Sequence, residues 1–110
     1  MNIQLGCSIH MWDPTEGTHS VKDCVDVVNL DEVTAEYPIK FCIDHSDDCI
    51  HVNHGYKYGK YSFHSSHNKE QFDKLFKVVM ENVDKDAIVT TESDGVSSQP
   101  CTIEDVANYF

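Results

Sequence analysis

Arginine is absent from this sequence, and its few basic residues are all lysines. Eight lysines stand against 19 aspartate and glutamate residues, which gives a formal charge of −11. Binding to nucleic acid depends on lysine and arginine side chains that neutralise phosphates, and arginine alone offers the planar fork for bidentate contacts. We therefore expect no direct nucleic-acid ligand.

Long apolar runs are also missing. No stretch approaches the ~18 consecutive apolar residues of a membrane-spanning helix, and residues 1–4 (Met-Asn-Ile-Gln) lack the basic start of a signal peptide. The five cysteines are odd in number and include no Cys-x-x-Cys pair. These features predict no membrane contact, free thiols and a cytoplasmic location.

Neither a repeat nor a linker divides the chain. Its 110 residues match the size of one ordinary domain, and 40% apolar content with 11 aromatic residues is enough for a folded core. We therefore expect residues 1–110 to form a single acidic domain.

Alternating apolar residues predict several strands. Residues 2–9 have the period of a half-buried strand, residues 10–20 are typical of an irregular loop, and residues 21–30 favour a strand through their valines. Residues 39–44, 49–53 and 60–64 then predict three antiparallel strands joined by two hairpin loops, with Ile, Phe, Val or Tyr on one face.

A helix is predicted over residues 68–83, because Phe72, Leu75, Phe76, Val79 and Val83 form one apolar stripe with Phe76 at its centre. Residues 87–91 favour a short strand, residues 92–100 a polar loop, and Thr102 caps the start of a short C-terminal helix. The expected fold class is α+β: a small, mostly antiparallel sheet packed by one long amphipathic helix, with a short C-terminal helix.

Five of the seven histidines lie within residues 45–67. A symmetric register for the two hairpins places Asp44 opposite Cys49, Cys49 opposite His64 and Cys42 opposite His51, all on the polar face. Cys42, Cys49, His51 and His64 thus form a candidate zinc site, although their spacing matches no standard zinc pattern. The same grid allows a small Cys/His enzyme with Cys42 as nucleophile, His51 as base and Asp44 as the orienting group.

Neither metal nor cofactor nor catalysis is the favoured expectation, because an acidic surface disfavours a reactive thiolate and the spacing is irregular. Acidic residues instead dominate residues 23–48, where Lys40 is the lone base. Such a segment attracts a basic protein partner. The candidate contact residues are its carboxylates together with two tyrosines at a hairpin tip: Asp23, Asp26, Asp31, Glu32, Glu36, Asp44, Asp47, Asp48, Tyr56 and Tyr58.

The leading hypothesis is thus an acidic binding protein of the inhibitor or immunity type, which covers a basic surface of a partner, such as a nucleic-acid-binding groove whose ligand it imitates. This rests on analogy between small acidic proteins and on no recognisable motif. The sequence does not indicate an oligomeric state.

Overall fold

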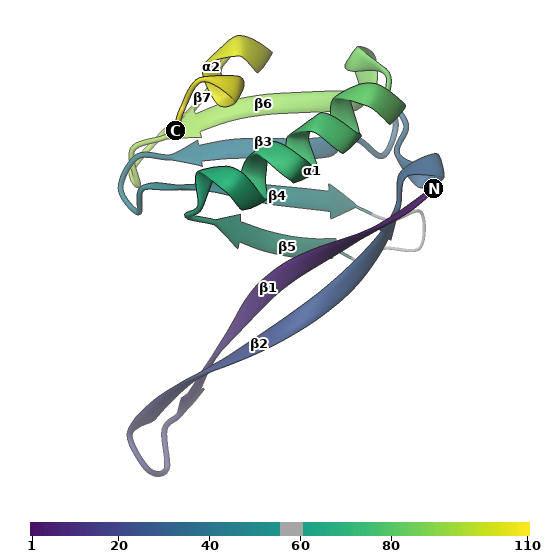
Figure 1. The fold of residues 1–110 in the computed structure, drawn as a ribbon. Helices are drawn as coiled ribbons and strands as arrows, with labels where there is room; N and C mark the ends of the chain where they lie inside the picture. Colours follow the sequence, from purple (N-terminus) through teal and green to yellow (C-terminus); the bar gives the residue numbers. More distant parts are fainter. Residues whose placement is uncertain (56–60) are drawn as a thin grey trace.

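The computed structural model describes residues 1–55 and 61–110, without the side chains of residues 5–12, 19, 21–26, 55 and 61–63. In the described part, a two-stranded hairpin and a five-stranded sheet are combined with one long and one short helix, which confirms the α+β class (Figure 1). The strands and helices are β1 (Asn2–Asp13), β2 (Thr18–Asn29), β3 (Ile39–Asp44), β4 (Cys49–Gly55), β5 (Tyr61–Ser66), α1 (Lys69–Asn82), β6 (Ile88–Ser93), β7 (Ser98–Pro100) and α2 (Ile103–Ala107).

Strands β1 and β2 form a long antiparallel hairpin that extends beyond the main sheet (Figure 1). The expectation of an irregular loop over residues 10–20 is wrong, because both strands continue to a tight turn in which Gly17 has a φ of 65°. The composition of that segment resembles a loop, but antiparallel pairing along the whole hairpin satisfies the backbone groups that face the partner strand. The N-terminus is fixed where Met1 contacts the Asp31 carboxylate at 2.7 Å, beside the 3-10 turn Leu30–Glu32.

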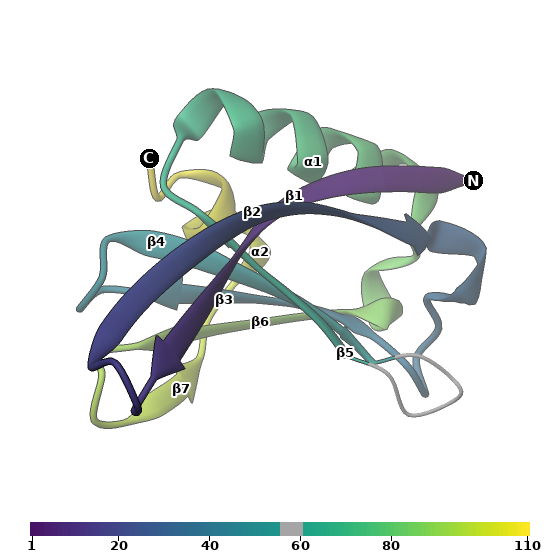
Figure 2. The same ribbon diagram turned by 90° about the horizontal axis from the view of Figure 1, so that it is seen from below.

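The main sheet has the order β5-β4-β3-β6-β7. Its strands are antiparallel except for β3 and β6, which run parallel. Helix α1 makes this possible because it carries the chain from β5, at one edge, back across the sheet to β6 (Figures 1 and 2). All of β7 lies inside the segment predicted as a polar loop, and β6 continues to Ser93, so that expectation is wrong for residues 92–93 and 98–100.

The predicted register is right for one hairpin and wrong for the other. Asp44 faces Cys49 and Cys42 faces His51, as expected. His64 faces Val52 rather than Cys49, and Ser65 rather than Ser62 faces His51, so the β4–β5 register is displaced by three residues. A displacement by an odd number moves every side chain to the opposite face. His64 consequently lies on the core face of the sheet, where it is 5% exposed.

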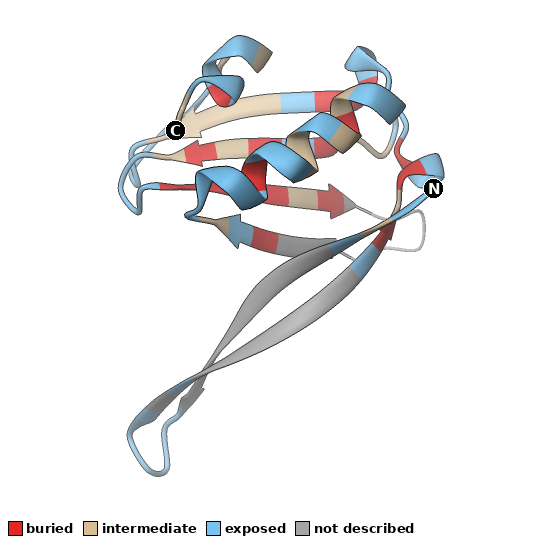
Figure 3. Cartoon of the chain, viewed as in Figure 1, coloured by how far each residue is buried: buried red, intermediate tan, exposed pale blue. Residues whose placement is uncertain are grey.

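Helix α1 packs on the core face and follows the predicted bounds. Asn68 caps it by accepting from the backbone N–H groups of Glu70 and Gln71. Figure 3 shows the exposed outer surface of the helix and its buried residues turned toward the sheet. The fully buried ring is Phe72, which contacts Phe41 edge-on at 6.0 Å, whereas Phe76 is only partly buried at the margin of the core.

The C-terminal segment closes the core on the same side. Thr102 and Asp105 form a reciprocal capping box at the start of α2, as the sequence predicts. Val106 is completely buried, and the Phe110 ring lies 5.6 Å from that of Phe72. Neither helix of the described chain has the length and hydropathy needed to cross a membrane.

Candidate functional site

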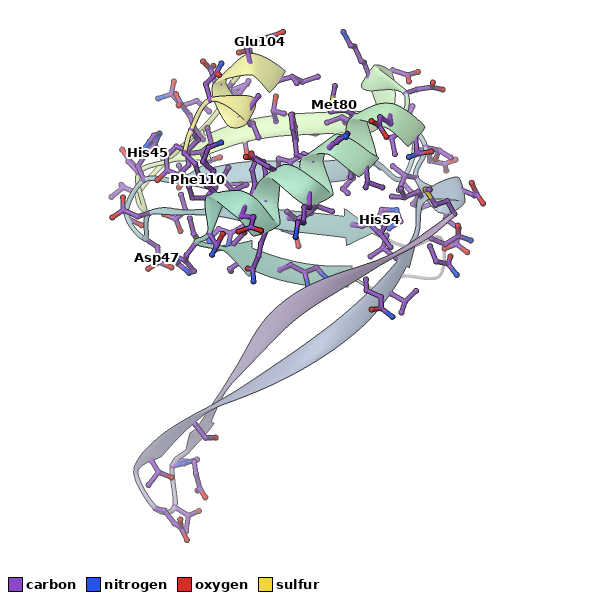
Figure 4. All side chains as sticks on the ribbon, in the orientation of Figure 1. His45, Asp47, His54, Met80, Glu104 and Phe110 are labelled. Atoms are coloured by element: carbon purple, nitrogen blue, oxygen red, sulfur yellow. The ribbon has the colours of Figure 1, made fainter. Side chains whose placement is uncertain are left out.

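The predicted acidic contact residues separate into two groups at opposite ends of the sheet. Asp31, Glu32 and Glu36 precede the start of β3, whereas Asp44 is its last residue and Asp47 and Asp48 follow it. A six-residue strand spans about 17 Å, so the two groups do not form one compact surface. Figure 4 shows this separation along the sheet, with Asp47 and His45 at one end and His54 at the other.

Two turns meet at the end of β3. The turn after β3 contains His45, whose backbone N–H donates to the Ser93 carbonyl at 2.8 Å. Across from it, Gly95 approaches Ser46 so closely that a Cβ on the glycine would lie 3.1 Å from the Ser46 Cβ and Oγ. The parallel pairing of β3 with β6 causes this contact, because parallel strands bring their carboxyl ends to the same edge.

Five carboxylates gather at these two turns. We call them the acidic end of the sheet: Asp44, Asp47, Asp48, Glu92 and Asp94. A small polar hollow that is open to solvent lies between the turns. Its lining includes Glu92, Asp94, His45 and Ser97. The two chain segments that form these turns contain no lysine, since none occurs in residues 41–55 or 86–110.

Local hydrogen bonds keep two of these carboxylates ionised. Bonds from the Ser46 hydroxyl and from His51 lower the pKa of Asp44 to about 2. Backbone N–H groups of Ser97 and Val96 lower the pKa of Asp94. Both groups therefore carry their charge throughout the physiological pH range.

A mixed cluster of side chains borders the acidic end on the face of the sheet opposite α1. We call it the thiol site: Asp44, Cys49 and His51, whose ligating atoms all lie within 4.8 Å of one another. The Cys49 Sγ lies 3.4 Å from His51 Nε2, and that nitrogen lies 2.9 Å from Asp44 Oδ2. The other ring nitrogen, Nδ1, is 2.8 Å from Ser65 Oγ. Asp47, Cys49 and His67 form a second such group that shares the same thiol.

This arrangement does not resemble a nucleophile with a base and an orienting acid. In such a relay the two ring nitrogens have different partners, one facing the nucleophile and one facing the acid. Here the Cys49 Sγ lies near both ring nitrogens of His51, 3.4 Å from Nε2 and 3.8 Å from Nδ1, and Asp44 shares Nε2 with it. Burial, with the nearby carboxylates of Asp47 and Asp44, raises the pKa of Cys49 to about 12, so the group is a thiol at neutral pH.

The remaining predicted site residues are placed as follows. Cys42 lies on the same face as His51 but outside both ligand groups, and its thiol donates to the Ile43 carbonyl. The predicted set Cys42, Cys49, His51 and His64 is therefore wrong as a zinc site, because His64 lies on the other face. Tyr56 and Tyr58 lie outside the described residues, and the side chains of Asp23 and Asp26 lie outside the described side chains.

Three residues of these sites were missed or undervalued from the sequence. Glu92 and Asp94 join the acidic end only because β6 is parallel to β3, and no local pattern signals that pairing. Ser65 orients His51 only in the observed β4–β5 register. The Asn68 cap was the signal that could have indicated this register. When β5 continues to Ser66, only one residue remains between the strand and the capping residue Asn68.

Comparison with models of known protein families, with curated proteins and with solved structures finds no match to this chain. The proposals below therefore rest on the residues of this chain and their arrangement.

Proposed function

We propose that this protein binds a basic protein partner through the acidic end of its main sheet. The observation that carries the proposal is the meeting of two turns, which brings five carboxylates to one end of the sheet, two of them, Glu92 and Asp94, at the wall of a hollow. The excess of acidic residues over the whole chain adds a long-range attraction for positive partners. An inhibitor or immunity protein that shields a basic surface of another protein fits this electrostatic character.

The hollow offers a specific place for a basic side chain. Glu92 and Asp94 present carboxylates at its wall, and Ser93 and Ser97 contribute further polar groups. An arginine or lysine of the partner can pair with these carboxylates while the surrounding charge steers the approach. The proposed contact surface is thus one end of the sheet, whereas the ten contact residues predicted from the sequence are scattered over the chain.

A kinetic experiment tests the position of this surface. The partner is isolated from extracts of the source cells, and its association is measured over a series of salt concentrations. The test variant carries Asp48→Asn with Glu92→Gln. Asparagine is chosen because residue 48 has a φ of 51°, a conformation that asparagine tolerates. The matched control carries Glu32→Gln with Glu36→Gln, which removes the same charge at the opposite end.

We expect the test variant to associate several-fold more slowly and to lose part of its salt dependence, because ions screen the attraction that steers the encounter. The control should change the association rate much less. Equal effects of the two variants would show that net charge, and not the acidic end, governs binding. An association rate indifferent to salt would contradict the proposal altogether.

A further inference from the structure

The thiol site has the donor atoms and the spacing of a metal centre. Thiolate, imidazole and carboxylate together suit zinc and similar divalent ions of borderline softness. Two ligand atoms at about 2.1 and 2.3 Å from a tetrahedral ion lie about 3.6 Å apart. The separation of 3.4 Å between Cys49 Sγ and His51 Nε2 is close to that distance. The same Sγ also lies 3.8 Å from Nδ1, so the His51 ring must turn before Nε2 points at an ion that the thiol binds.

The third ligand needs only a small movement. His51 Nε2 and Asp44 Oδ2 are 2.9 Å apart, as expected for a hydrogen bond, and two such atoms around a zinc ion are about 3.3 Å apart. For an ion to bind, the ring proton moves from Nε2 to Nδ1, where Ser65 Oγ can accept it, and the His51–Asp44 pair opens by about 0.4 Å. Since Asp44 and His51 side chains are 19% and 17% exposed, an ion can reach them from solvent.

The surrounding residues hold two of the ligands in place. The His51 ring is oriented through Nδ1 by Ser65, as second partners orient metal-ligating histidines. The other oxygen of Asp44 accepts from the backbone N–H groups of Ser46 and Asp47, which leaves Oδ2 directed at His51. Neighbouring strands β3 and β4 thus bring three ligand groups close together, and a turn of the His51 ring directs Nε2 at a shared ion.

We propose that Cys49, His51 and Asp44 bind one zinc-type divalent ion per chain. The fourth position is left to water or to Asp47, whose Oδ2 lies 3.8 Å from the Cys49 Sγ. This site differs from the acidic end in its chemistry, because it requires the thiol and the imidazole. It also differs from the set predicted from sequence, since Cys42 and His64 take no part.

Cobalt titration of the untagged protein tests this assignment, because a thiolate bound to tetrahedral Co²⁺ gives a charge-transfer absorption band. We expect the band to saturate at one ion per chain and to disappear on addition of excess Zn²⁺. Cys49→Ser and Cys49→Ala should abolish it. Cys42→Ser, on the same face, and Cys101→Ser, at the other side of the sheet, are the matched controls and should retain it.

Variants of exposed residues distinguish the loss of a metal ligand from the loss of the folded structure. Ser65→Ala should keep the circular dichroism of the folded protein and weaken cobalt binding about 10- to 100-fold, because it releases the His51 ring. His67→Ala should leave cobalt binding unchanged. Loss of the band in His67→Ala but not in His51→Ala would overturn the assignment of ligands. A folded wild-type protein that gives no band at saturating Co²⁺ would overturn the site.

These outcomes are measured without the partner and can be distinguished from a failure of the proposed function. Asp48, Glu92 and their variants lie outside the three ligands, so partner binding can fail while cobalt binding persists, and the reverse also holds.

Discussion

Truncation of the Phe72 ring examines how the core is built. Phe72 is 1% exposed and contacts three other rings: Phe41, Phe76 and Phe110, at centroid distances of 6.0, 5.3 and 5.6 Å. Burial of a phenylalanine side chain contributes about 1.5–3 kcal/mol, and aromatic pairs add about 0.5–1.5 kcal/mol each. With the cavity that remains, Phe72→Ala should lower the free energy of unfolding by about 3–5 kcal/mol.

Phe76→Ala should cost less, although Phe76 is the centre of the apolar stripe in the sequence. This ring lies at the margin of the core and is only partly buried, so we expect a loss of about 1–2 kcal/mol. Lys74→Ala is the control on the exposed side of α1. Its ion pair with Glu70 spans 3.5 Å between side chains that are almost four-fifths exposed, and such pairs contribute little.

Urea denaturation followed by circular dichroism measures the three variants. With a dependence of about 2 kcal/mol per molar urea, Phe72→Ala should move the midpoint by about 2 M. For a domain of this size the total free energy of unfolding is about 5–15 kcal/mol, so the shift is a large share of it. If Phe76→Ala cost as much as Phe72→Ala, the packing of α1 described here would be incorrect.

Three local features can be tested by substitution: the cap of α1, the glycines with positive φ and the buried His54. Asn68→Ala removes the cap of α1 and should lower the free energy of unfolding in urea by about 1 kcal/mol, whereas Asn68→Asp keeps an acceptor and should cost less. Gly95→Ala should destabilise more than Gly17→Ala in the same assay, because both glycines have positive φ but a Cβ at Gly95 also meets Ser46. Burial lowers the pKa of His54 from 6.5, so the unfolded chain takes up its proton first and stability should fall as pH decreases below about 6.5. Denaturation of His54→Gln between pH 7.5 and 5 should show a shallower fall, and an unchanged slope would refute this effect.

Local patterns in the sequence predicted the parts of the fold that depend on neighbouring residues. The stripe from Phe72 to Val83 and the Asn68 cap predicted α1, because helix period and capping are short-range properties. The hairpin of β3 and β4 was also predicted in the correct register. Its short turn leaves Asp44 opposite Cys49, and these two residues form the thiol site together with His51 of the same hairpin.

Pairing between strands that are distant in sequence could not be predicted from local patterns. The loop between β4 and β5 is longer, and assuming symmetry there displaced the register by three residues and placed His64 on the wrong face. The parallel pairing of β3 with β6 joins residues some 50 positions apart in sequence. Since neither turn carries a sign of the other, the sequence did not predict that Glu92 and Asp94 lie beside Asp44, Asp47 and Asp48, and it left open whether the acidic residues of 23–48 form one face.

The two proposals share Asp44, and this makes their coupling predictable in sign. Zinc carries two positive charges, and even when one thiol proton leaves, its binding makes the acidic end more positive by one charge. A more positive surface attracts a basic partner less, and thermodynamic linkage requires the partner to weaken zinc binding by the same factor. Partner affinity measured with and without saturating Zn²⁺ should therefore decrease with the metal in the wild-type protein and stay constant in Cys49→Ser. A partner that binds more tightly when zinc is present would show that the ion organises the binding surface itself, and the acidic end would then act through structure more than through charge.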